Sequence, residues 1–266
     1  MSHLLRRHAP ITEESWSRID QEARERLTPA LAARKLVDFA GPSGWQHSAT
    51  NLGRTAAVEA PFDRVAGRQR RVLPLVEMRT GFSVARAELA DSDRGAEDAD
   101  FADLDRAAHD LAAAENASVF HGWEAAGIVG IAEASPYEAM ALGSDCDRYP
   151  RHVAIAVEQL LAAGIDGPYG LALGREAYEL VLESAEHAGV LLLDHLRKIL
   201  GGPLVWAPGV EGAVVVSLRG GDFLFESGED ISVGYLDHDA DAVRLYLEES
   251  FSFRIATPEA AFALTP

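Results

Sequence analysis

The sequence contains a single cysteine, Cys146, among its 266 residues. One cysteine cannot form a disulfide within the chain, and the closely spaced cysteine pairs of zinc sites and thiol redox sites are missing. No apolar run approaches the roughly 18 residues that a membrane helix needs, and no apolar signal-peptide core follows Arg6 and Arg7. These absences predict a protein of a reducing, cytoplasmic compartment that does not cross a membrane.

Basic side chains are scarce as well. The chain has 24 Lys and Arg residues against 42 Asp and Glu residues, a formal net charge of −18, and only Lys35 and Lys198 are lysines. Nucleic-acid binding needs a basic surface, and an anionic membrane repels an acidic protein. We therefore expect neither nucleic acid nor membrane as a partner. The hydrophobic share of 48% is ordinary for a globular chain with a sizeable core.

The common catalytic motifs are missing too. The sequence has no Walker A loop, no GxGxxG motif after a strand, no HExxH and no GxSxG. The Gly220-Gly221 pair is more simply a hairpin turn than a phosphate-binding loop. Cys146 lies between Asp145 and Asp147, whose negative charges disfavour a reactive thiolate. The sequence thus predicts no catalytic residue and favours a structural or assembly role over a stand-alone enzyme.

One acidic cluster resembles a calcium-binding loop. Counted from Asp237, positions 1, 3 and 5 are Asp and position 12 is Glu248, but position 6 is Ala242 where the sharp turn needs Gly. Because Glu248 also falls within a predicted strand, we interpret the cluster as an acidic hairpin turn and expect no metal or other cofactor. The rival hypothesis is a discrete acidic metal-dependent hydrolase that uses Asp237–Asp241.

Helical and strand periodicities follow one another without a regular βαβ alternation, which predicts the α+β class. Helices are predicted at 12–27, 28–37, 103–120, 150–163 and 175–200, and strands at 72–89, 168–173, 214–218, 223–225 and 243–255. Pro29 would begin the second helix, and the last helix is interrupted near 187–189. The clearest pattern is in 243–255, where apolar side chains occupy the odd positions and Glu249 is the one exception.

Residues 41–71 fit neither period. Gly, Pro, Ser and Asn are scattered through them, and Arg64, Arg68, Arg70 and Arg71 form a small basic cluster in an acidic chain. A segment of this length without its own core is unusual inside a compact domain. Two arrangements remain open, an arm that packs on another subunit or a long hairpin on the same chain.

Several stretches, in this order, resemble the encapsulin shell proteins, also described as linocin-like bacteriocin proteins. They are 8–16 (HAPITEESW), 33–45 (ARKLVDFAGPSGW), 72–79 (VLPLVEMR), 164–173 (GIDGPYGLAL), 219–235 (RGGDFLFESGEDISVGY) and 241–255 (DAVRLYLEESFSFRI). The resemblance implies the fold of the major capsid proteins of tailed phages, and a shell protein of about sixty copies with closed icosahedral symmetry. A secreted bacteriocin, which the older family name implies, is a weaker alternative because no signal peptide is evident.

The resemblance also implies a division of the chain. The expected segments are an N-terminal helical region of the peripheral domain (1–45), an extended loop or arm over a neighbouring subunit (46–71), a peripheral domain (72–132 and 223–266) and an axial domain (133–222). The residues that would line the five-fold pore are Glu186, His187, Ala188 and Gly189.

Family shells enclose a cargo enzyme, typically a dye-decolourising peroxidase or a ferritin-like protein, through a C-terminal targeting peptide of the cargo. The peptide would bind an inner groove between the N-terminal helical region and the peripheral domain. The matching positions are Arg34, Leu36, Asp38, Phe39, Ile231, Val233 and Val243. Some relatives carry flavin, but the predicted strand around 82–89 has Ala87 in its middle and no Trp or Tyr to stack on the flavin ring, so we expect none.

Overall fold

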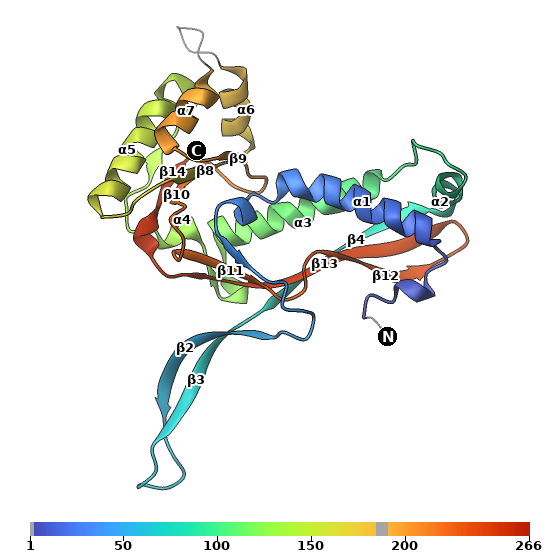
Figure 1. The fold of residues 1–266 in the computed structure, drawn as a ribbon, viewed down its shortest axis with the longest axis horizontal. Coiled ribbons are helices and arrows are strands. Elements are labelled where there is room, and N and C mark those ends of the chain that lie inside the picture. The colour runs from blue at the N-terminus through green and yellow to red at the C-terminus, as the bar shows by residue number, and fades with distance from the viewer. Residues whose placement is uncertain (1–2, 185–190) are drawn as a thin grey trace.

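A computed structural model describes residues 3–184 and 191–266. It confirms the α+β class: two five-stranded sheets lie side by side, each covered by helices, and a two-stranded hairpin projects from the body (Figure 1). In the part of the chain described, no helix is both long and apolar enough to cross a lipid bilayer.

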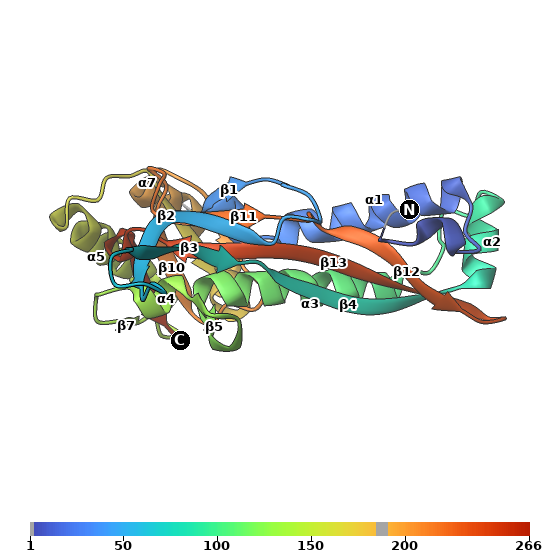
Figure 2. The same ribbon diagram turned by 90° about the horizontal axis from the view of Figure 1, so that it is seen from below.

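The first sheet is built around one long strand. Its members, in order, are β1 (Asp38–Ala40), β11 (Phe223–Ser227), β13 (Ala242–Ile255) and β12 (Ser232–His238), with β4 (Val76–Ala85) also pairing with β13. β13 is antiparallel to β11, β12 and β4, and it runs the length of the sheet when the molecule is seen from below (Figure 2). The predicted strand 243–255 is therefore confirmed.

Two long helices cover one face of this sheet. α1 (Glu13–Ala30) packs on α3 (Ala102–Phe120), and α3 packs on β4 and β13. The odd-numbered apolar side chains of β13 up to Phe253 are at most 2% exposed. On the opposite face, Tyr246, Glu248, Ser250 and Ser252 are also buried, whereas Arg254 is exposed. The base of the hairpin contacts this face. Thr50 and Ser252, for example, share a buried hydrogen bond of 2.6 Å.

The second sheet combines four strands that lie between β4 and β11 in the sequence with one strand that follows β13. Its order is β7 (Met140–Ala141), β14 (Ala261–Thr265), β10 (Ala213–Ser217), β8 (Tyr169–Leu173) and β9 (Leu204–Trp206), with α5 (Tyr149–Ala162), α6 (Arg175–Glu183) and α7 (Leu192–Leu200) packed around it. The predicted assignment of 223–266 to one domain needs correction here. β14 pairs with β10 and β7, so the last strand belongs to the sheet of the predicted axial domain.

The remaining elements are short. They are α2 (Arg86–Asp93), α4 (Ile131–Ala134), β5 (Gly122–Trp123), β6 (Ile128–Val129) and the 3-10 turns Arg6–His8, Ala33–Lys35, Glu124–Ala126, Cys146–Arg148 and Pro258–Ala260. Two predicted boundaries were wrong. Pro29 lies in the last turn of α1 instead of starting a helix, and the strand predicted to reach residue 89 ends at Ala85, so that Ala87 is helical.

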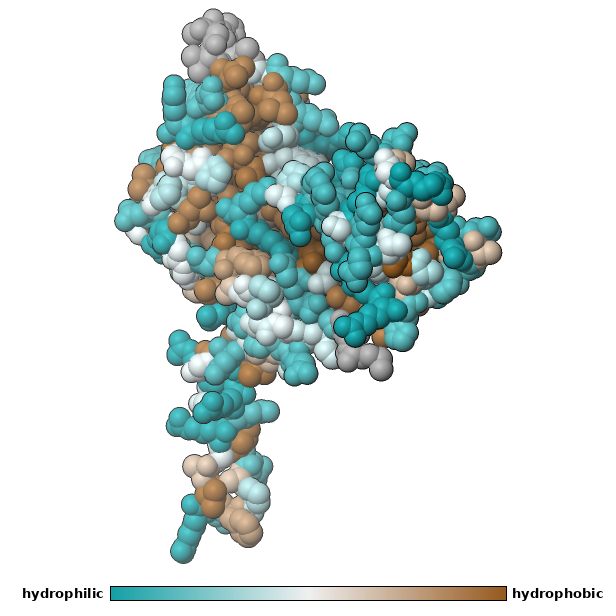
Figure 3. Space-filling model, turned by 45° about the vertical axis from the view of Figure 1, so that its right-hand side comes forward, coloured by the Kyte–Doolittle hydropathy of each residue, from teal (hydrophilic) through white to brown (hydrophobic). Residues whose placement is uncertain are grey.

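The segment predicted as an arm or a hairpin has the hairpin form within this chain. β2 (Ala49–Val58) and β3 (Gly67–Pro74) pair only with each other, and the hairpin extends away from both sheets. We call residues 49–74 the arm. Phe62 (74%) and Val65 (58%) are exposed in the loop at its tip. Tan and brown atoms lie close to the end of the arm in the space-filling view (Figure 3). Contact with another subunit stays a prediction.

The Gly220-Gly221 pair is not a hairpin turn as predicted. The strands on either side, β10 and β11, belong to different sheets, so the pair forms the crossover between the sheets. Both glycines have positive φ, at 87° and 84°, which other residues adopt at a cost. The backbone N–H of Gly221 donates to Asp38 Oδ2 at 2.6 Å, which ties the crossover to β1.

Candidate functional site

A groove of about 430 Å³ lies between α1 and the edge strand β12. Residues of α1 form one wall of the groove, and residues 230–233 at the start of β12 form the other. The N-terminal segment, with Leu4 and Arg6, lies at one end of the groove. The lining residues are Leu4, Arg6, Asp20, Ala23, Arg24, Leu27, Thr28, Leu31, Arg34, Asp230, Ile231, Ser232, Val233 and Leu247. The groove therefore has an aliphatic floor and charged rims.

Arg34 is held in place by the chain that follows α1. Asn116 of α3 accepts from the backbone N–H groups of Ala32 and Ala33 at 3.0 and 2.9 Å. Its amide nitrogen donates to the carbonyl oxygens of Ala30 and Pro208. A fully buried Asn that satisfies four backbone groups fixes the end of α1. This fixed turn directs Arg34 into the space between α3 and the sheet.

The Arg34 guanidinium binds three carboxylates from three different elements. Its nitrogens lie 2.7 Å from Glu115 Oε2 on α3, 2.8 Å from Glu249 Oε2 on β13 and 2.6 Å from Asp230 Oδ1 before β12. Glu115 and Glu249 are 0% and 1% exposed, whereas the Asp230 side chain is 48% exposed at the groove. Glu249, the one break in the apolar pattern of β13, is therefore a buried partner of Arg34.

The network holds more negative charge than positive. Burial raises the pKa of Glu249 well above its ordinary value, and the negative charge of Glu115 raises it further. Burial likewise raises the pKa of Glu115, against the opposing effect of Arg34. The second carboxyl oxygens, Glu115 Oε1 and Glu249 Oε1, are buried without a hydrogen-bond partner among the described residues. Both carboxyls therefore hold their protons to higher pH than exposed glutamates do.

The N-terminal segment forms the end wall of the groove. The carbonyl oxygen of Leu4 accepts from the backbone N–H of Tyr235 at 2.9 Å, which attaches the segment to the edge strand β12. Arg6 pairs with Asp20 of α1 at 2.8 Å and lies over the Trp16 ring. These contacts link the segment to both walls of the groove.

The structure brings together only part of the predicted cargo-binding set. Arg34, Ile231 and Val233 line the α1–β12 groove. Leu36 and Asp38 line a second hollow of about 190 Å³ beside the Gly220-Gly221 crossover. Phe39 is 36% exposed and stacks on Phe225, with the Arg34 guanidinium 5.0 Å from its ring centre. Val243 is fully buried in β13, four residues along the strand from Leu247.

Sequence reasoning missed the α1 wall of the groove. Asp20, Arg24, Leu27 and Leu31 follow one another at helical spacing along one stripe of the helix. This stripe borders the buried face that the amphipathic pattern identifies. Leu27 also belongs to the buried face of α1, but without the position of β12 nothing in the sequence identified Asp20 and Arg24 as groove residues.

The acidic cluster 237–241 forms a tight turn between β12 and β13. Asp239 accepts from the backbone N–H groups of Asp241 and Ala242 at 2.9 and 3.0 Å, and these bonds, with Arg244, lower its pKa to about 2. Asp237 also pairs with Arg244, and Glu248 lies further along β13 against Arg79. The calcium-loop arrangement is thus not formed. Within residues 3–184 and 191–266, no group of three or more His, Cys, Asp or Glu could hold a metal ion.

The predicted pore residues Glu186, His187, Ala188 and Gly189 lie outside the described residues. The flanking helices α6 and α7 are described, and Cys146 lies near the end of α6, with its Sγ 2.9 Å from Ser184 Oγ.

The fold is that of virus capsid proteins. A virus-like particle protein from Pyrococcus furiosus superimposes with a TM-score of 0.64 over 94% of this chain and 99% of that chain, at 17% identity.

Comparison of the sequence is more specific than comparison of the fold. A family model described as "Encapsulating protein for peroxidase" matches residues 1–252. Type 1 encapsulin shell proteins from Rhodospirillum rubrum and Mycolicibacterium paratuberculosis are 47% and 40% identical, covering 99% and 100% of this chain and 96% and 100% of theirs. The chain belongs to the encapsulin shell protein family.

Proposed function

We propose that this chain is a non-catalytic shell protein that assembles, in about sixty copies with closed icosahedral symmetry, into a compartment around a cargo enzyme. The arm is the observation that carries the proposal. It adds no strand to either sheet of its own chain and exposes apolar side chains at its tip. An apolar tip on a projecting hairpin is costly in water unless a neighbour covers it. Membership of the shell protein family supports the same conclusion.

For the cargo we propose a C-terminal peptide of a dye-decolourising peroxidase or a ferritin-like protein, bound in the α1–β12 groove. The description of the family model as encapsulating a peroxidase supports the first of these. The aliphatic floor formed by Leu27, Val233 and Leu247 suits apolar side chains of an extended peptide. Arg34 and Asp230 at the rim would fix its register through polar contacts.

Purified native protein tests the assembly. Gel filtration with light scattering, followed by negative-stain microscopy, should show closed hollow particles of megadalton mass. A monomer or dimer at physiological salt would refute the shell proposal. Mass spectrometry of the particle contents would identify the enclosed enzyme.

A pair of variants tests the groove. Ile231→Asp places a charge on the half-buried β12 wall and should lower the amount of co-purifying enzyme without loss of particles. Phe39→Asp tests in the same way the exposed ring that lies beside the Arg34 guanidinium. Leu161→Asp, at a 53% exposed position on α5, is the matched control. Unchanged loading in Ile231→Asp would refute our placement of the peptide in the α1–β12 groove, and reduced loading in Phe39→Asp alone would place it beside Phe39 instead.

A further inference from the structure

The arm has the opposite charge to the rest of the chain. Five arginines of the arm outnumber its two acids, Glu59 and Asp63, so its net charge is +3 while the remainder carries −21 of the total of −18. The arginines are Arg54, Arg64, Arg68, Arg70 and Arg71, and all five side chains are exposed. The arm is therefore a concentrated cationic segment in an acidic chain.

Ten of the 17 arginines of the body form ion pairs with carboxylates of their own chain, whereas none of the five arm arginines does so among the described residues. Ion pairs within the chain hold Arg6, Arg26, Arg34, Arg79, Arg94, Arg106, Arg148, Arg175, Arg219 and Arg244. Among the described residues, no carboxylate pairs with any of the five arm arginines. Their charges are therefore available to a partner.

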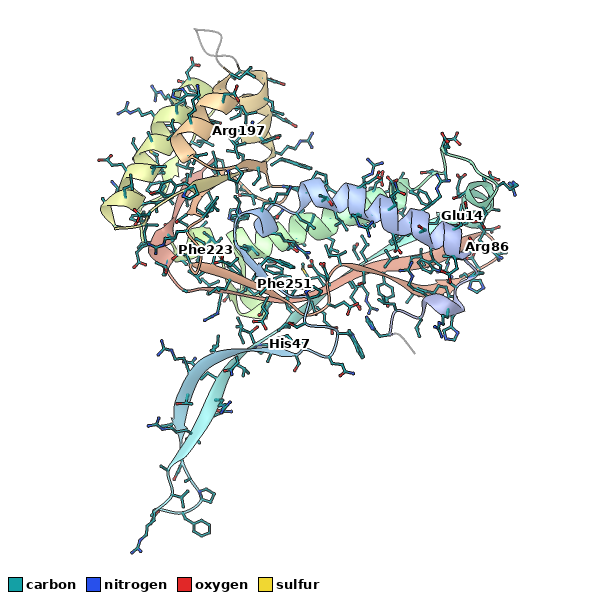
Figure 4. All side chains as sticks on the ribbon, in the orientation of Figure 1. Glu14, His47, Arg86, Arg197, Phe223 and Phe251 are labelled. Atoms are coloured by element: carbon teal, nitrogen blue, oxygen red, sulfur yellow. The ribbon has the colours of Figure 1, made fainter. Side chains whose placement is uncertain are left out.

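The strand register distributes these charges over both faces of the arm. Arg54 of β2 lies directly opposite Arg71 of β3, and Thr55 lies opposite Arg70. Because side chains alternate along a strand, Arg54 and Arg71 share one face, and Arg68 and Arg70 share the other. Figure 4 shows side chains pointing away from both sides of the arm beyond His47 at its base.

The pair formed by Arg54 and Arg71 is unfavourable in an isolated chain. Like charges directly opposite each other on antiparallel strands repel. A carboxylate from outside the arm would convert this repulsion into attraction, and the acidic body of another copy supplies such carboxylates at high density. Nucleic acid is also anionic, but the charge of −21 on the body of each copy would repel it.

We propose that the arm is held between two neighbouring copies of this chain, with acidic body surfaces forming ion pairs to Arg54 and Arg71 on one face and to Arg68 and Arg70 on the other. The inference rests on the proposed assembly and specifies the chemistry of its contacts. Particle formation should consequently require positive charge on each face of the arm and weaken as salt screens it.

Charge reversal on each face separately tests this proposal. Arg54→Glu/Arg71→Glu and Arg68→Glu/Arg70→Glu should each lower the yield of particles about ten-fold or more, because like charges would then meet at the contact. Arg68→Lys/Arg70→Lys keeps the charge and should assemble. Arg94→Glu/Arg106→Glu changes the net charge equally on α2 and α3, away from the arm, and is the matched control. Circular dichroism checks that each variant is folded.

Several outcomes would overturn the inference. Either reversal leaving the particle yield within about two-fold of the control would do so, as would reassembly of dissociated wild-type subunits equally well in 50 mM and 1 M NaCl, where screening lengths differ about five-fold. Nucleic acid that co-purifies with the wild type and is lost from the reversal variants would show a different partner. If the wild type forms no particles at all, the proposed function fails instead.

Discussion

The arm and the first sheet use arginine in opposite ways. In the sheet, Arg34 is surrounded by Glu115, Glu249 and Asp230 of the same chain, and the two glutamates are completely buried. In the arm, Arg54 and Arg71 face each other across two strands that pair with each other and belong to neither five-stranded sheet. The charge of Arg34 is therefore compensated within one chain, whereas the arm arginines pair with no carboxylate of the described residues and need neighbours. Stability of the fold and stability of the assembly should respond to different mutations.

Removal of the arm should have the largest effect on assembly and a small one on the fold. The backbone N–H of Leu75 donates to the carbonyl of Ser48 at 3.0 Å, so a short Asn-Gly turn can replace residues 49–74. We expect the shortened chain to fold, because neither sheet of the body contains β2 or β3, but to form no particles. Gel filtration and circular dichroism measure both. Particles of normal yield would contradict the comparison.

Arg34→Ala should give the largest loss of fold stability. It leaves Glu115 and Glu249 buried without their cation, and breaking a buried ion pair in this way costs about 3–5 kcal/mol. Denaturant unfolding at fixed protein concentration measures the loss. Arg26→Ala removes a 52% exposed arginine and serves as the control, with an expected change of about 0–1 kcal/mol. Equal losses in the two variants would show that the network does not stabilise the body.

The raised pKa values of Glu115 and Glu249 should make stability depend on pH. Their pKa values are raised in the folded chain above the ordinary value of 4.5, so the folded state retains a proton that the unfolded state releases. Stability from this source is present below about pH 4.5 and declines as pH rises towards the raised pKa, by up to about 1.4 kcal/mol per pH unit.

Glu249→Gln isolates this contribution. The amide keeps the shape and cannot ionise, so the free energy of unfolding should fall less between pH 5.5 and 8.5 than in the wild type. Glu226→Gln is the control, because it also removes one carboxylate but from a partly exposed site. Glu226 pairs with His47, and its side chain is 30% exposed. Parallel pH profiles for Glu249→Gln and wild type would show that Glu249 does not contribute this pH dependence.

The smallest expected effect lies where the arm joins the body. Thr50→Val removes the buried hydrogen bond to Ser252 without changing the side-chain shape, and should lower stability by about 1–2 kcal/mol. Thr55→Val makes the same change on the exposed part of the arm and should be close to neutral. A neutral Thr50→Val would mean that the arm base is not anchored to β13 through this bond.

Local sequence patterns predicted the elements that have one uniformly apolar face. The alternation in 243–255 identified β13, and proline followed by helical spacing identified α5. The predictions failed where a local signal had two meanings. Pro29 can start a helix or sit in its last turn, and Gly220-Gly221 can close a hairpin or link two sheets. Only the partners of the flanking segments distinguish these cases.

The sequence by itself determined the α+β class, the acidic character, the cationic segment and, through resemblance, the family. Composition and short-range periodicity suffice for the fold class, the charge and the cationic segment, because these properties depend on residues that are close in the sequence. Tertiary structure alone decided why Glu249 interrupts an apolar strand, because its partners Arg34 and Glu115 lie more than a hundred residues away in the chain. It also decided that β14 joins the second sheet and that Arg54 faces Arg71, since strand pairing is a long-range choice that local sequence does not encode.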